Sequence, residues 1–69
     1  MEFQLENNEY IELNRLLKLL GLVESGGQAN MFITEGQIIV NGKTEYRKRN
    51  KLRVGDVVMF MGQEVRIVE

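Results

Sequence analysis

The spacing of apolar residues changes once along the chain, and this change restricts the folds that the chain can adopt. Before residue 35, apolar side chains recur every three or four positions, which is typical of helices with one buried face. After Gly36 they alternate with polar residues in short runs, as in strands. A short alternating run, residues 1–5, precedes the helical part. The predicted order is one strand, two helices and several short strands.

The first helix is predicted over residues 9–20 and is expected to end at Gly21. Glu9 and Glu12 would lie in its first turn, where acidic side chains favour the helix dipole. The second helix is predicted to start at Ser25 and end at Gly36, because Ser25 and Gln28 have the spacing of a capping box. The apolar stripes consist of Tyr10, Leu13, Leu16, Leu17 and Leu20 in the first helix, and Ala29, Phe32 and Ile33 in the second.

The strands after the helices are predicted at residues 37–40, 43–45, 57–61 and 64–68. Asn41-Gly42 is a signal for a two-residue hairpin turn of the mirror-image type I class, and a second turn is expected at Gly62-Gln63. Between the hairpins we expect an irregular loop, held to the core by Leu52 and Val54, and a further turn at Gly55-Asp56.

Composition excludes several classes of function. The 69 residues are enough for one domain, residues 1–69, with one small core. Because the chain has neither cysteine nor histidine, it offers no disulfide, no usual zinc site, no thiol nucleophile and no Ser-His pair. We therefore expect no catalysis, cofactor, metal or small-molecule substrate. With no long apolar run or signal peptide, a cytoplasmic location without membrane contact is expected.

Basic residues are concentrated in one part of this slightly acidic chain. Residues 1–40 carry two bases and six acids, whereas residues 41–69 carry seven bases and four acids. Residues 47–53, which we call the basic loop, contain five bases and no acid to pair with them. Such a loop can simply be solvated, but its self-repulsion favours an anionic partner, above all a polyphosphate chain. The candidate phosphate contacts are Arg47, Lys48, Arg49, Lys51 and Arg53.

The start of the second helix is another candidate site. Ser25 can be a cap and nothing more. Gly26 and Gly27, however, would leave backbone N–H groups unshielded at the positive end of the helix dipole, where phosphate can bind. Close packing of the two helices is the alternative explanation for the glycines.

Tyr46 and the Asn41-Gly42 turn allow two interpretations each. Tyr46 borders the basic loop and can either stack on an unpaired base or pack its ring against the strand. Asn41-Gly42 can be pure hairpin geometry or can present an amide and a bare backbone to a partner.

The ordered set of motifs resembles the alpha-L RNA-binding motif of ribosomal protein S-four. The residues that carry the resemblance are Leu13-Asn14-Arg15-Leu16-Leu17, Gly21-Leu22, Ser25, Gln28-Ala29, Ile33, Gly36, Ile38, Val40-Asn41-Gly42 and Gly55-Asp56-Val57. The Ser25–Ala29 and Glu45–Leu52 segments are similar to the small stand-alone bacterial members, the YbcJ-like proteins. The resemblance implies an α+β fold with two helices packed on a small curved, mainly antiparallel sheet.

The resemblance also implies binding of structured RNA, ribosomal RNA included. By position it adds Arg15, Ser25, Gln28, Asn41, Gly42 and Lys43 to the expected RNA-binding surface. Many family members have arginine at the position of Gly26 and a base at that of Asn30. Either the bare amides or the basic loop replace these cations here, or RNA binding is weakened.

We interpret the chain as a non-catalytic RNA-binding protein that uses the basic loop and the start of the second helix. One alternative is a protein-interaction module whose basic loop binds an acidic partner. A weaker alternative is a ubiquitin-like sulphur carrier, but such carriers end in Gly-Gly, whereas this sequence ends in Val68-Glu69.

Overall fold

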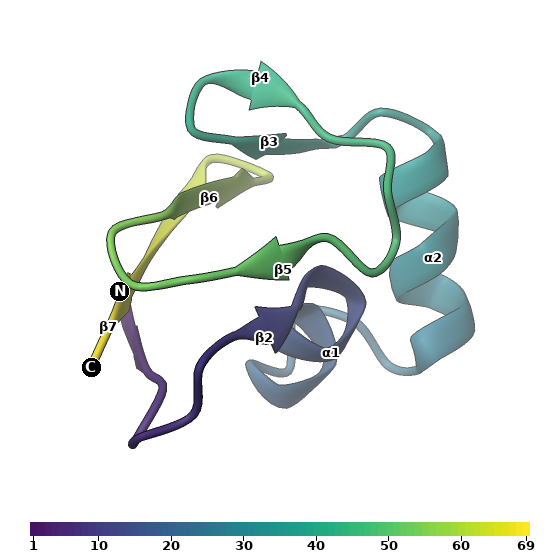
Figure 1. The fold of residues 1–69 in the computed structure, drawn as a ribbon. Coiled ribbons are helices and arrows are strands. Elements are labelled where there is room, and N and C mark those ends of the chain that lie inside the picture. Colours follow the sequence, from purple (N-terminus) through teal and green to yellow (C-terminus); the bar gives the residue numbers. More distant parts are fainter.

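Two helices cover one face of a five-stranded sheet in the computed structural model, which describes all 69 residues (Figure 1). The elements are β1 (Glu2–Gln4), β2 (Ile11–Glu12), α1 (Leu13–Leu19), α2 (Gly26–Thr34), β3 (Ile38–Val40), β4 (Lys43–Thr44), β5 (Lys51–Leu52), β6 (Val57–Phe60) and β7 (Gln63–Val68). Neither helix has the length and apolar character needed to cross a membrane.

The main sheet has the strand order β1-β7-β6-β3-β4. β1 pairs with β7 in parallel, and all other neighbours are antiparallel. Side chains alternate between buried and exposed along β3, β6 and β7, because only one face of the sheet is covered by the helices. The predicted α+β fold, with two helices and a mainly antiparallel sheet, is confirmed.

A second, two-stranded sheet joins β2 to β5, and it contradicts two predictions. Residues 9–12 are not helical: Ile11 pairs with Leu52 and Glu12 with Lys51. The expected irregular loop therefore contains a strand, and α1 begins only at Leu13. Glu9 and Glu12 consequently lie outside the first turn, which holds no acidic residue.

Backbone carbonyl groups of the basic loop, and not a side-chain cap, accept hydrogen bonds from the first N–H groups of α1. The N–H of Leu13 donates to the carbonyl oxygen of Asn50 at 2.9 Å, and the N–H of Asn14 donates to that of Lys48 at 3.0 Å. Glu12, the cap residue, makes no side-chain hydrogen bond to the helix. A tertiary contact has therefore replaced the local cap and fixed the first helical residue.

The Ser25 cap predicted for the second helix is present, but the reciprocal half of the capping box is shifted by one residue. The Ser25 hydroxyl accepts a hydrogen bond from the Gln28 N–H at 3.1 Å. The Gln28 side chain accepts one from the N–H of Glu24, one residue before the cap. Gly36, with φ of 79°, follows the end of α2 as expected.

The first hairpin turn is confirmed, and the second is displaced by one residue. Asn41 and Gly42 have φ of 51° and 84°, as the mirror-image type I turn requires. In the second hairpin Phe60 pairs with Gln63, so Met61 and Gly62 are the turn residues, with φ of 52° and 76°. Glycine thus occupies the second turn position in both hairpins.

The core consists of 15 buried residues, all apolar, contributed by both helices and both sheets. Leu52 is fully buried and holds the basic loop to the core, as predicted. Val54 is 55% exposed, so the prediction that it also anchors the loop is wrong. Tyr10 is likewise not part of a helical stripe, since it precedes β2 and remains 37% exposed.

Candidate nucleic-acid interface

The basic loop follows β4, passes α2 and returns beside the start of α1 as β5 (Figure 1, green). Its backbone is fixed by the two hydrogen bonds to the first residues of α1. The Asn14 amide nitrogen donates to the Asn30 side-chain oxygen at 3.2 Å, which ties α1 to α2 at the same place. The loop is therefore held at the start of α1, at the point where α1 is bonded to α2.

Three cations of the basic loop line one shallow hollow of about 440 Å³. Its lining residues are Arg47, Arg49, Asn50 and Lys51. No carboxylate lines this cationic hollow. Because Arg47 pairs with Glu45, the unpaired positive charge of the hollow comes from Arg49 and Lys51. Charge of this sign in a concave surface is suited to a phosphate group.

Two of the five loop bases do have acidic partners, so the prediction that the run has no acid to pair with is wrong. Arg47 makes a bidentate contact with Glu45, with Nε–Oε2 and Nη2–Oε1 distances of 2.9 and 3.1 Å. Arg53 donates from Nη1 to the Glu9 carboxylate at 3.1 Å. Both arginines remain more than half exposed, at 76% and 51% of the side chain. Lys48, Arg49 and Lys51 have no ion pair.

The Glu45–Arg47 contact should make stability depend on pH in acid. Hydrogen bonds and charge attraction from the Arg47 guanidinium lower the pKa of Glu45 below its ordinary value of 4.5. A lowered carboxyl pKa adds stability that is complete above the ordinary pKa and is lost as the pH falls through the folded value. Glu45→Gln should therefore lower the free energy of unfolding at pH 7 and lower it by less at about pH 3, below the ordinary pKa of the carboxyl. Urea unfolding of both proteins at each pH measures this, and an equal loss at both would contradict the assignment.

Tyr10 contacts the basic loop, which its spacing in the sequence did not indicate. Lys51 Nζ lies 4.9 Å and Arg53 Cζ 5.6 Å from the centroid of its ring, within the range of cation–π attraction. These contacts arise because β2 runs antiparallel to β5. Tyr10 therefore holds two loop cations in place, whereas its sequence spacing suggested a buried helical residue.

The glycine pair at the start of α2 has no structural explanation within the chain. A methyl group added to Gly26 would meet no atom within 4 Å, and one added to Gly27 would meet only Ser25 Oγ, at 3.8 Å. Neither glycine has a positive φ. Close helix packing, the alternative considered from sequence, is thus contradicted. The N–H groups of both residues also have no acceptor in the chain.

Asn41 is engaged within the fold. Its side chain donates to Asp56 Oδ1 and accepts from the Val57 N–H, both at 2.9 Å. The other Asp56 oxygen accepts from the N–H of Arg53, at 2.8 Å. The hairpin tip is therefore linked to the end of the basic loop, next to the exposed Gly42 and Lys43.

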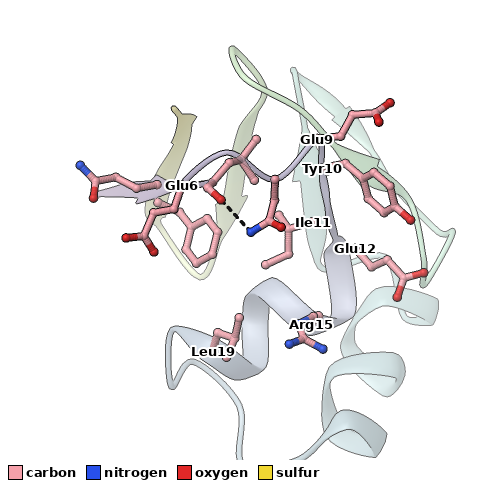
Figure 2. A pocket seen from close by; sticks show the side chains of 11 residues that line it. Glu6, Glu9, Tyr10, Ile11, Glu12, Arg15 and Leu19 are labelled. Atoms are coloured by element: carbon pink, nitrogen blue, oxygen red, sulfur yellow. Dashed lines mark hydrogen bonds between the residues drawn. The ribbon is translucent and has the colours of Figure 1, made fainter.

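Arg15 lies in a different hollow from the loop cations. It lines a groove of about 560 Å³ between the N-terminal segment and α1 (Figure 2). The groove also contains the carboxylates of Glu6, Glu9 and Glu12, and Arg15 is its single base. The groove and the cationic hollow share no lining residue. The structure thus gathers three of the five loop bases, Arg47, Arg49 and Lys51, but separates Arg15 from them.

Comparison with known families identifies the domain. The family model described as S4 domain matches residues 3–68. The chain belongs to the S4 domain family. This assignment agrees with the resemblance carried by the motifs from Leu13 to Val57.

Two curated relatives match the S4 chain over most of their length. It is 47% identical over 66 residues to Escherichia coli (strain K12) "Putative RNA-binding protein YbcJ", covering 96% of this chain and 94% of that protein. It is 41% identical over 56 residues to Bacillus subtilis (strain 168) "Probable ribosome maturation protein RlbA", covering 81% and 79%.

Solved structures show the same fold. The solution structure of YbcJ from E. coli, described as an alpha-L motif involved in RNA binding, has a TM-score of 0.75 at 46% identity and covers 99% of this chain and 86% of that one. The 30S ribosomal protein S4e from Thermoplasma acidophilum has a TM-score of 0.68 at 22% identity, covering 84% and 31%.

Proposed function

We propose that this chain is a non-catalytic RNA-binding domain that contacts the phosphates of structured RNA with the basic loop and the start of α2. The observation that carries the proposal is the cationic hollow, which three bases and an asparagine line without any acid. Two of these bases, Arg49 and Lys51, have no ion pair and are free to form charge-assisted contacts with phosphate. The names of the YbcJ and RlbA relatives point to the same class of partner.

Ribosomal RNA, bound in the cytoplasm, is the target class that we favour. The support is the name of the B. subtilis relative, which is that of a ribosome maturation protein. Paired A-form RNA hides its base edges in a deep groove, so contacts to phosphates and shape would dominate there. The site would consist of the loop bases together with Ser25, Gly26, Gly27 and Gln28, with Gly42 and Lys43 beside the end of the loop.

A salt titration tests this proposal. The three unpaired loop cations predict that log K falls with log salt with a slope of roughly −2 to −3. The affinity of a hairpin RNA, measured by fluorescence anisotropy at several salt concentrations, gives the slope directly. No binding at low salt, or a slope near zero, would refute the proposal.

Substitutions at Gly26 and Gly27 should change stability and RNA affinity in opposite directions. Gly26→Ala and Gly27→Ala should each raise the free energy of unfolding by up to about 1 kcal/mol, since alanine favours the helix and finds open space. The same changes should weaken RNA binding, because a methyl group shields the free N–H groups. Urea unfolding and RNA titration of each variant measure the two effects. If both variants bind RNA with unchanged affinity, the start of α2 is not part of the binding site.

A further inference from the structure

Tyr46 is exposed and held in place at the edge of the basic loop. Tyr46 is 62% exposed and immediately precedes Arg47. The ring approaches Gly36 so closely that a methyl group there would lie 3.2 Å from Cε1 and 3.3 Å from the hydroxyl oxygen. Thr44 lies on the same side, with its methyl carbon 3.6 Å from that position. The ring thus rests on the end of α2, although most of the residue remains in solvent.

Nothing in the chain occupies the exposed part of this ring. No cation lies over it, in contrast to Tyr10, whose ring is in contact with Lys51 and Arg53. Its hydroxyl makes no hydrogen bond within the chain. The two tyrosines therefore differ: Tyr10 holds cations, whereas Tyr46 presents a free aromatic surface.

The position of Tyr46 relative to the cationic hollow indicates what could use this surface. The next residue, Arg47, lines the hollow. A nucleotide whose phosphate occupies the hollow would have its own base, or that of its neighbour, within reach of Tyr46. Aromatic side chains stack on bases of any identity, but bases inside a paired helix already stack on each other.

We propose that Tyr46 stacks on an unpaired base, so that the preferred target is a helical RNA interrupted by an unpaired nucleotide. The inference rests on the proposed RNA-binding function and defines the class of RNA more closely. Binding would then combine phosphate contacts in the hollow with one stacking contact beside it. Base stacking of this kind changes affinity by between about 5- and 150-fold.

The experiment compares two RNAs: a blunt duplex and the same duplex with one unpaired nucleotide inserted. The wild-type protein should bind the bulged RNA at least about 5-fold more tightly. Tyr46→Ala should remove this preference and leave affinity for the blunt duplex and the salt slope unchanged. Tyr46→Phe should retain the preference, because it keeps the ring. Circular dichroism confirms that each variant is folded.

Fluorescence gives a second measurement. The chain has two tyrosines and no tryptophan, so Tyr10→Phe leaves Tyr46 as the single tyrosine emitter. Its emission should be quenched by the bulged RNA and much less by the blunt duplex at equal occupancy. This measurement observes the ring itself and does not depend on replacing it.

The outcomes distinguish this inference from the function on which it rests. If both RNAs bind equally, or Tyr46→Ala weakens both by the same factor, stacking is wrong while RNA binding stands. If quenching is equal for both RNAs, the ring does not sense the unpaired base, and the inference is again wrong. If neither RNA binds at low salt, the proposed function fails and the inference fails with it.

Discussion

Replacing Lys48 and Arg49 together with glutamine should weaken binding of RNA by about 100-fold at low salt. Neither side chain has an acidic partner, so each is free to form a charge-assisted contact, which contributes about 1.5 kcal/mol at the lower end of its range. The salt slope should become less negative by roughly 1.5, because two fewer phosphates are neutralised. Anisotropy titrations of one hairpin RNA at several salt concentrations measure both quantities.

A matched control changes the charge by the same amount elsewhere. Arg66→Gln combined with Gln4→Glu also lowers the net charge by two units, but these exposed residues lie on β7 and β1 and neither lines the cationic hollow. This variant should bind RNA within about 3-fold of the wild type, since only long-range screened attraction is altered. Equal losses in the two double variants would show that net charge, and not the basic loop, controls binding.

The parts of the fold that the sequence predicted are those decided by local chemistry. The cap at Ser25 and the turn at Asn41-Gly42 each depend on residues within four positions of one another. The prediction of where α1 starts was wrong for the opposite reason, because that start depends on residues distant in the sequence. Its first N–H groups are bound by Asn50 and Lys48, and β2 exists only because Ile11 pairs with Leu52. No pattern within residues 9–12 contains that information.

The candidate site likewise has features that the local sequence determines and features that depend on the fold. The concentration of bases is a property of the sequence, and the structure gathers three of them around one hollow. Their pairing is not local: Glu9 reaches Arg53 across 44 positions, and Tyr10 contacts Lys51 from the neighbouring strand. The number of free cations, and hence the expected salt dependence, could therefore be obtained only from the fold.

Leu52→Ala should be among the most destabilising single changes in the chain. The side chain is fully buried, and such truncations cost about 2–5 kcal/mol. A domain of this length has a free energy of unfolding of only about 3–10 kcal/mol, so a large part of its stability would be lost. Urea unfolding monitored by circular dichroism measures the change.

Val54→Ala is the matched control. It removes apolar atoms from a side chain that lies two residues after Leu52 and is 55% exposed. It should change the free energy of unfolding by less than about 0.5 kcal/mol. Similar losses in the two variants would mean that Val54 holds the basic loop as strongly as Leu52 does, which its exposure contradicts. A large difference would show that one leucine on β5 both completes the core and fixes the backbone that carries Lys51 and Arg53. Because the same two-residue strand performs both tasks, a variant that loosens Leu52 should lose RNA affinity even in the molecules that remain folded.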